Sequence, residues 1–305
     1  LWAMLTKLAY SPRARSLSTV NWGAPGWPGF CSLIEILQKK AIVPSWEVDR
    51  LDVIFRAAAD DRDRGATEIE ARLVSELLGR RELWNAEQLE HAAVQLVKAQ
   101  SAMANLRNLA RCLSSGSLDE IEARVRRRAE LLSEMDRRLG AASWPHLKGA
   151  QRVVTISRSS AVKAALNEAW RRGWRGEVVV FDGSSAGRGA DQARRLAARS
   201  DRVFSQPDAL MPTWLGSRGV RVLTGADAVS RRRLINVCGT GALLELAAAR
   251  SVPVFVVADT GKDLPDAELD ELLGAGPSAT GEGPNRRWPI FEIASLELVS
   301  GRIHE

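Results

Sequence analysis

The sequence predicts an α/β protein in which a small all-helical domain precedes a parallel β-sheet covered by helices on both faces, a doubly wound arrangement. Two observations carry this prediction. Apolar residues recur at helical spacing between Ser45 and Arg138, whereas short β-branched runs alternate with amphipathic stretches after residue 150. Strands that are buried on both faces of a parallel sheet read as continuous apolar runs, which is the pattern of this second half.

Residues 1–44 are expected to form an irregular basic tail. Their acid-free opening carries Lys7, Arg13 and Arg15, and the first acidic residue is Glu35. A basic segment without acids is also typical of an organelle transit peptide. The alanine- and arginine-rich remainder has the composition of a bacterial protein, which argues against that alternative.

Four helices are expected in the helical domain, residues 45–150. The first begins at a Ser45 cap, the second begins near Thr67, and the third spans about Asn85 to Leu113. Ser117 and Glu120 form a capping-box sequence that opens the fourth. The arginines of this fourth helix are expected to form a solvated face that is balanced by glutamates; they are Arg124, Arg126, Arg127 and Arg128.

The second domain, residues 151–305, carries five apolar runs that we expect to be strands. They are Val153–Ile156, Glu177–Phe181, Arg202–Phe204, Val220–Leu223 and Val254–Val257. Ligands of an open parallel sheet bind at the carboxyl ends of the strands, so the residues after each run are candidates for a site. A glycine-rich stretch from Gly274 to Pro284 is expected to be a loop.

The residues after the first run suit a phosphate. Ser157, Arg158, Ser159 and Ser160 combine hydroxyls and a guanidinium with the free amides of a helix start. The alternative is that the serines only cap the helix. The loop Asp182–Gly189 has the same two interpretations, a phosphate-binding loop or a plain surface turn.

The residues after the fourth and fifth runs extend the same edge. Asp227 can act as a base or bind a sugar hydroxyl, and Lys262 supplies charge for an anionic ligand. Asn236 and the helix start Gly239–Thr240 lie beyond Asp227. The run Arg231–Arg233 is either a solvated turn or an anion contact.

Composition narrows the class of protein. The 305 residues are 45% hydrophobic and 26% charged, which excludes a disordered or collagen-like chain. No apolar run reaches the roughly 18 residues of a membrane-spanning helix, so we expect a soluble protein without a membrane partner. The net charge is +6 and the pI is near 9.6, but the positive charges are spread over the tail and a glutamate-balanced helix. This distribution argues against a nucleic-acid partner.

Cysteine and histidine are too scattered for a disulfide framework or a metal site. Cys31, Cys112 and Cys238 include no close pair, and Cys238 is expected to be a small buried residue. The histidines also lack the spacing of metal ligands; they are His91, His146 and His304. We therefore expect no metal, no cofactor and a cytoplasmic location.

Several strings of the second domain resemble one known family. They are GADAV at 225–229, Asn236, Gly239–Thr240, the segment 243–262 that ends in DTGK, and the closing segment 289–305 with its Phe-Glu pair. Upstream, Arg64-Gly65-Ala66 and Asn105-Leu106 resemble further family segments. Together these residues are similar to the alpha, beta and delta regulatory subunits of eukaryotic translation initiation factor 2B. Ribose-1,5-bisphosphate isomerase and methylthioribose-1-phosphate isomerase belong to the same superfamily.

The resemblance covers the chain from about Asp60 to the end. It implies a helical N-terminal domain, a Rossmann-like C-terminal domain, a cleft between them for a phosphorylated sugar or nucleotide, and a homodimer formed through the C-terminal domain. Together with the strand-end residues, it gives as candidate ligand-binding residues Arg64, Gly65, Ser157, Arg158, Asn236, Gly239, Thr240 and Lys262, and Asp227 is catalytic if the protein is an isomerase.

Four positions depart from the isomerase pattern. The catalytic cysteine of these isomerases corresponds to Ser157, whose hydroxyl is a much weaker acid and nucleophile than a thiol. Two family arginines correspond to Gln100 and Ser184, and a family lysine corresponds to Val237. Arg107, Arg158 and Arg188 are candidates to replace the lost charge.

Three functions remain open from the sequence. The first is a protein that binds a phosphorylated sugar or nucleotide without the isomerase chemistry. The second is an aldose-ketose phosphosugar isomerase that uses Asp227. The third is a regulatory or interaction subunit in translation.

Overall fold

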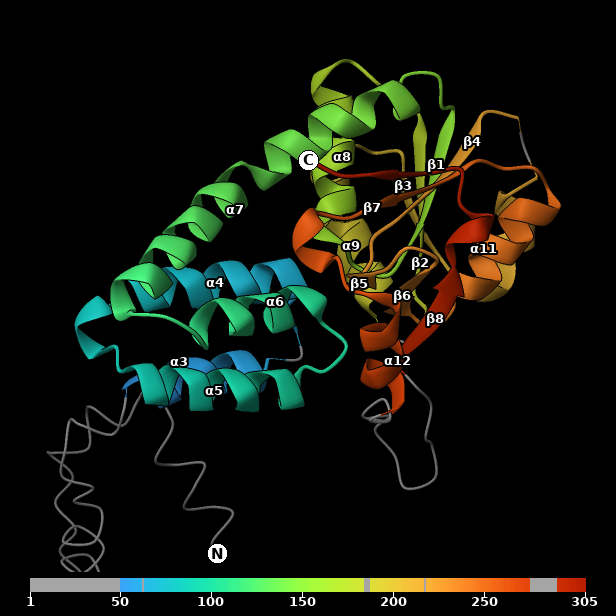
Figure 1. Ribbon diagram of the computed structural model, residues 1–305. Coiled ribbons are helices and arrows are strands. Elements are labelled where there is room, and N and C mark those ends of the chain that lie inside the picture. Colours follow the sequence, from blue (N-terminus) through green and yellow to red (C-terminus); the bar gives the residue numbers. More distant parts are fainter. Residues whose placement is uncertain (1–49, 62, 184–186, 217, 275–289) are drawn as a thin grey trace, which may run out of the picture. The chain divides into compact units, whose positions relative to one another are not determined.

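The computed structural model describes residues 50–305 except residue 62, residues 184–186, residue 217 and residues 275–289 (Figure 1). The expected tail, the Ser45 cap and most of the loop expected after Gly274 lie outside these described residues. Within them, no helix is both long enough and apolar enough to cross a membrane.

The described chain begins with an all-helical region, which confirms the first half of the predicted fold class. The apolar faces of these helices share one core that includes Leu51, Leu73, Leu89 and Leu109, each at most 2% exposed. The helices are α3 (Arg50–Ala59), α4 (Ala66–Leu78), η2 (Arg81–Leu83, a 3₁₀ turn), α5 (Ala86–Ala99), α6 (Ala104–Leu113) and α7 (Leu118–Leu147).

The single long helix expected over Asn85–Leu113 is wrong, because the chain breaks between α5 and α6. The side-chain amide of Gln100 donates to the carbonyls of Ala58, Ala59 and Asp61 at 3.2, 3.1 and 2.8 Å. The Ala104 N–H donates to the carbonyl of Asp227 at 2.9 Å instead of to its own helix. These tertiary hydrogen bonds override the continuous helical periodicity.

Helix α7 begins where it was predicted and ends later. The Ser117 hydroxyl accepts from the Glu120 N–H at 3.3 Å and the Glu120 carboxylate accepts from the Ser117 N–H at 2.7 Å, so the capping box is confirmed. The helix then continues through Pro145 to Leu147 rather than ending before it. Proline has no N–H, so Pro145 leaves the carbonyl of Ala141 without its helical hydrogen bond. Both residues are exposed, and water can donate to that carbonyl instead.

The two halves of α7 belong to different cores. Ile121 and Val125 pack in the helical core, whereas Met135, Leu139 and Leu147 pack in a core of the sheet. Gly140 allows α7 to approach α8 (Ser160–Arg171) closely, because a Cβ at Gly140 would lie 2.8 Å from the Cβ of Glu168. The helix therefore joins the two parts of the described chain.

Beyond α7 the chain forms a six-stranded sheet in the order β3-β2-β1-β4-β7-β9, with every neighbouring pair parallel. Taken in chain order this is the 3-2-1-4-5-6 arrangement of Rossmann-like sheets, so the predicted fold class is confirmed. The strands are β1 (Arg152–Ile156), β2 (Glu177–Phe181), β3 (Val203–Gln206), β4 (Val220–Thr224), β7 (Val254–Val257) and β9 (Gly301–Ile303).

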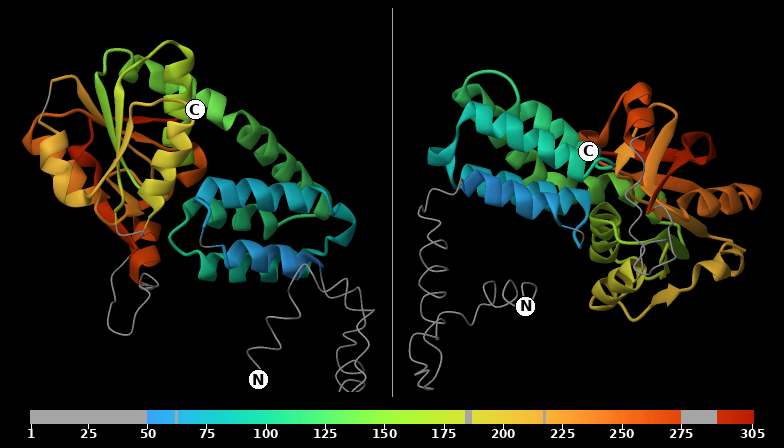
Figure 2. Two further views of the ribbon diagram at one scale, coloured as in Figure 1. Left: turned by 180° about the vertical axis from the view of Figure 1, so that it is seen from behind. Right: turned by 90° about the horizontal axis from the view of Figure 1, so that it is seen from below.

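Successive strand residues point to opposite faces of the sheet. Val153 and Val178 pack with α7, α8 and α9 (Arg188–Ala197) on one face. Val154 and Val179 pack with α10 (Met211–Trp214) and α11 (Thr240–Ala249) on the other. Figure 2 shows the helices around the sheet from two further directions.

Sequence patterns missed β9 and a second, antiparallel sheet in the order β5-β6-β8. Arg233 lies in β6 and forms an ion pair with Asp270 at 2.6 Å, so the arginine run is only partly the expected turn. The missed elements of this part are β5 (Ala228–Val229), β6 (Arg233–Val237), α12 (Asp266–Gly274), β8 (Phe291–Ser295) and the 3₁₀ turns η3 (Asp208–Leu210), η4 (Thr260–Lys262) and η5 (Leu296–Leu298).

Candidate functional site at the carboxyl ends of the strands

The candidate residues after the strands lie where the fold class predicted them. Ser157 and Arg158 follow β1, Arg188 begins α9 after β2, Asp227 follows β4, and Lys262 ends the η4 turn after β7. Since these strands are parallel, their carboxyl ends lie along one edge of the sheet.

Ser157, at the position of the isomerase cysteine, adopts an unusual backbone conformation. It is buried, with 7% of its surface exposed, and its φ is 57°, in the left-handed region that non-glycine residues seldom occupy. Its N–H donates to the carbonyl of Phe181 at 2.6 Å. Backbone strain of this kind is concentrated at functional sites.

Ser159 caps the helix that follows β1. The Ser159 hydroxyl accepts from the Val162 N–H at 3.2 Å and caps α8, which confirms the capping alternative for this residue. Gly225 makes room for it, because a Cβ at Gly225 would lie 2.5 Å from the Ser159 hydroxyl oxygen. The segment that carries Asp227 therefore packs directly against the start of α8.

Arg158 and Arg188 are two neighbouring positive charges at this edge. Arg158 Nη1 donates to Asp191 Oδ2 at 3.2 Å, while its buried Nη2 has no hydrogen-bond partner within the described part of the chain. Burial lowers the pKa of Arg188 and the charge of Arg158 lowers it further, whereas the carboxylate of Asp227 opposes this shift. Arg188 is thus within electrostatic reach of both Arg158 and Asp227.

Asp227 and Lys262 form the other charged pair of the edge. Burial raises the pKa of the Asp227 carboxyl, although the positive charges of Lys262 and Arg188 oppose the shift. The Lys262 side chain is 5% exposed, and its Nζ donates to the carbonyl of Ala226 at 2.6 Å. A carboxyl with a raised pKa beside a buried ammonium is a recurrent arrangement of acid–base sites.

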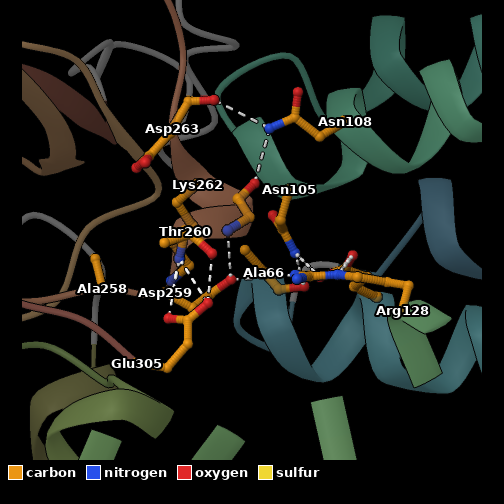
Figure 3. Close-up of polar contacts among 12 residues, drawn as sticks. Ala66, Asn105, Asn108, Arg128, Ala258, Asp259, Thr260, Lys262, Asp263 and Glu305 are labelled. Atoms are coloured by element: carbon orange, nitrogen blue, oxygen red, sulfur yellow. Dashed lines mark hydrogen bonds and ion pairs between the residues drawn. The ribbon is translucent and has the colours of Figure 1, made fainter. Parts of the chain in front are cut away.

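A buried ion-pair network lies next to Lys262 (Figure 3). Arg128 Nε and Nη2 donate to the two carboxylate oxygens of Glu70 at 2.6 and 2.7 Å, and Nη2 also donates to Asp259 at 3.1 Å. The side chains of Glu70 and Asp259 are each 1% exposed. The prediction that all four arginines of α7 form a solvated face is therefore wrong for Arg128.

The charges of this network influence one another. Burial raises the pKa of Glu70, and the hydrogen bonds from Arg128 and Asn105 oppose the shift only in part. Burial would lower the pKa of Arg128, but Glu70 and Asp259 outweigh it and raise that pKa. This network was not predicted from the sequence. Glu70 lies on the same helix face as the core residues Leu73 and Leu77, and a carboxylate on such a face is the signal that could have indicated a buried basic partner.

Two asparagines of α6 also connect the helical region to the segment around Lys262 (Figure 3). Asn105 Nδ2 donates to the carbonyl of Ala66 at 2.8 Å and to Glu70 at 3.0 Å. Asn108 Nδ2 donates to the carbonyls of Gly261 and Asp263 at 2.9 and 3.1 Å. The helical region thereby holds the segment that carries Lys262.

Arg64 and Gly65 lie at the start of α4. Arg64 is exposed and forms an ion pair with Asp61 at 2.6 Å, and Gly65 is the N-cap residue of α4. Asp61 and Asp63 act electrostatically on Arg188, so this segment lies near the strand ends.

Asn236, Gly239 and Thr240 have partners inside the fold. Asn236 Nδ2 donates to the hydroxyls of Thr224 and Thr240 at 2.9 and 3.0 Å. The Glu292 carboxylate accepts from the N–H groups of Gly239 and Gly241 at 2.8 and 2.7 Å. The start of α11 is therefore capped by a side chain, and a ligand-binding role for these three residues stays a prediction.

Cysteine chemistry has little support at this edge. Cys238 is half-buried rather than buried, and Cys112 has a pKa that burial raises, which disfavours a thiolate. Within the described ranges, no group of three or more histidine, cysteine or acidic side chains is arranged to hold a metal ion.

Comparisons with known proteins identify the family. Residues 47–274 match the model of the Initiation factor 2 subunit family. The putative translation initiation factor eIF-2B subunit 2-like protein of Pyrococcus abyssi is 27% identical over 267 residues, which cover 84% of this chain and 95% of that protein.

Solved structures agree in fold. The translation initiation factor eIF-2B of Pyrococcus horikoshii superposes with a TM-score of 0.72 at 22% identity, covering 84% of this chain and 94% of that one. A chain of the tetrameric eIF2B-beta2-delta2 complex of Chaetomium thermophilum superposes with a TM-score of 0.62 at 15% identity, covering 92% and 94%. Since the family model spans well over half of the sequence, the chain belongs to the Initiation factor 2 subunit family.

Proposed function

We propose that this protein binds a phosphorylated sugar or nucleotide at the carboxyl ends of its strands, facing the helical region, without the isomerase chemistry of the wider superfamily. The observation that carries the proposal is the pair Arg158 and Arg188. Arg158 Nη1 pairs with Asp191 at 3.2 Å, but its buried Nη2 has no hydrogen-bond partner among the described residues. The positive charge of Arg188 acts on Arg158, so a phosphate oxygen that accepts from this Nη2 would be attracted by both guanidinium groups.

The loss of isomerase chemistry rests on Ser157. At neutral pH a serine hydroxyl gives no appreciable anion, whereas a cysteine in the same position is readily activated. Gln100, at the position of a family arginine, donates to three backbone carbonyls and has no charge to offer a phosphate. A site with these changes retains features for binding while lacking the usual proton-transfer partner of Asp227.

Thermal unfolding in the presence of ribose phosphates and nucleoside monophosphates tests the proposal. A ligand present at about 100 times its Kd stabilises the native state by about 2.7 kcal/mol. We expect the stabilisation to disappear in Arg158→Gln and Asp227→Ala and to persist in Arg127→Gln, an exposed arginine of α7. Absence of a shift with every ligand, or equal shifts in all variants, would contradict the proposal.

One observation favours a second function, a phosphosugar isomerase. Asp227 has a raised pKa and lies within electrostatic reach of Lys262, which suits a general base that exchanges a proton with a sugar carbon. Incubation with ribose-1,5-bisphosphate or methylthioribose-1-phosphate, followed by detection of the ketose, separates the two functions. Turnover that Asp227→Asn abolishes would establish the isomerase; binding without turnover would support the first proposal.

The names of the relatives favour a third function, a subunit in translation initiation. One structural neighbour is part of a tetrameric complex. A corresponding role here includes a homodimer formed through the C-terminal domain and a cytoplasmic location. Light scattering of the purified protein tests the dimer, and co-purification with a tagged chain tests for initiation-factor partners.

A further inference from the structure

A pocket of about 450 Å³ lies where β4 and β7 begin, at the edge of the sheet opposite the candidate site. Its lining comes from the segments that lead into these two strands. Because β4 and β7 are parallel neighbours, with Val222 beside Val254, the two segments lie side by side. The pocket has the volume of a small-molecule site, about 300 to 1,000 Å³.

Of the described residues, three arginines line this pocket and no acidic residue does. They are Arg218, Arg221 and Arg250. Within the described residues none of them forms an ion pair, whereas Arg152 at the start of the adjacent β1 pairs with Glu177 at 2.6 Å. Like charges around one open pocket repel, and a bound anion would relieve this repulsion.

Backbone carbonyls hold two of the guanidinium groups in place. Arg221 Nη1 donates to the carbonyl of Val220 at 2.9 Å, and Arg250 Nη1 donates to the carbonyl of Pro212. A guanidinium carries five N–H donors, so each arginine keeps further donors for a ligand. Planar donor groups of this kind match the oxygens of a phosphate.

The backbone beside Arg250 has a left-handed residue at the end of α11. Ser251 has a φ of 54°, and among the described residues Ser157 is the other non-glycine residue with a positive φ. Ser157 lies at the candidate site, and Ser251 lines the arginine pocket. The N–H groups of Ser251 and Val252 donate to the carbonyls of Ala248 and Ala247 at 3.0 and 2.9 Å, so the left-handed Ser251 closes the end of α11 in a common way and fixes the backbone next to Arg250.

We propose that the pocket is a second anion site, which binds a phosphate-bearing small molecule through Arg218, Arg221 and Arg250. The site is separate from the carboxyl-end site and does not depend on the function proposed for it. It also gives a role to part of the excess positive charge of the chain.

Calorimetric titration of the full chain with pyrophosphate tests this proposal, because pyrophosphate offers phosphate oxygens without a base or a sugar. We expect Arg218→Ser/Arg250→Ser to weaken one saturable site at least about tenfold, since each loses a charge-assisted hydrogen bond. The matched control Arg127→Ser/Arg199→Ser removes the same charge from exposed arginines elsewhere and is expected to leave the affinity within about twofold.

A third variant separates the two sites. Arg158→Gln alters only the carboxyl-end site. We therefore expect pyrophosphate to bind the arginine pocket of this variant with unchanged affinity, whether or not it binds the carboxyl-end site. Arg218 and Arg250 are exposed, and equal unfolding curves would show that their replacement leaves the fold intact. Absence of saturable binding at millimolar pyrophosphate, equal weakening in the control, or loss in Arg158→Gln alone would overturn the proposal.

Discussion

Arg128 and Asp259 are 131 residues apart in the sequence and are joined by a hydrogen-bonded ion pair of 3.1 Å. Arg128 belongs to α7, and Asp259 begins the η4 turn, where its carboxylate also accepts from the Gly261 N–H at 3.0 Å. Lys262 ends the same turn. The ion pair therefore connects the helical region to the segment that supplies a charge of the candidate site.

Replacement of Arg128 by alanine is expected to destabilise the protein by about 3 to 5 kcal/mol, because Glu70 and Asp259 would remain buried without a counter-charge. Urea unfolding measures the change. The control is Arg126→Ala in the same helix, whose side chain is 60% exposed and pairs with Glu122; its expected cost is at most about 1 kcal/mol. Equal costs in the two variants would show that the buried network adds no stability.

Asp227→Asn is expected to stabilise the protein at neutral pH. Burial raises the folded-state pKa of Asp227 above the unfolded value of about 3.9, so its ionisation costs stability as the pH rises through the folded pKa. Asparagine does not ionise and avoids this cost. The stability difference between variant and wild type is expected to be largest near pH 7 and to shrink below about pH 4. Unfolding curves across this range check the trend, and a difference that grows at low pH would refute it.

The sequence was sufficient to predict the elements whose signals are local. The strand β2 has the predicted bounds Glu177–Phe181, and the Ser117–Glu120 capping box opens α7. Arg158, Asp227 and Lys262 were also selected from the sequence, because each follows a predicted strand and a parallel sheet brings the carboxyl ends of its strands to one edge.

The missed features depend on contacts between distant residues. Arg128 lies in one run with the exposed Arg126 and Arg127. Its partners Glu70 and Asp259, which distinguish it from them, are 58 and 131 residues away in the sequence. The break before Ala104 depends on a hydrogen bond to Asp227. Strands β6 and β8 pair across a long separation in the chain, so neither carries a hairpin signal.

Glu292→Ala is expected to cost about 1 to 2 kcal/mol, because the Glu292 carboxylate satisfies two N–H groups at the start of α11 and interacts with the helix dipole. Glu297→Ala is the control, since Glu297 is exposed in η5, and we expect its cost to stay within about 0.5 kcal/mol. Chemical unfolding of both variants checks this. A cost for Glu292→Ala no greater than that of the control would show that the cap contributes nothing.

Gly225→Ala is expected to destabilise the protein by about 1 to 3 kcal/mol, because the new Cβ would lie 2.5 Å from the Ser159 hydroxyl oxygen. The Ser159 side chain cannot move away without weakening the hydrogen bond with which it caps α8. Gly149→Ala serves as the control: a Cβ there meets no atom of the described residues within 4 Å, so its effect is expected to stay within about 0.5 kcal/mol. Urea unfolding compares the two substitutions. Gly225 lies two residues before Asp227, so the same crowding is expected to lower the affinity for any ligand that contacts Asp227. Unchanged stability in Gly225→Ala would show that this segment can move away from α8 at little cost.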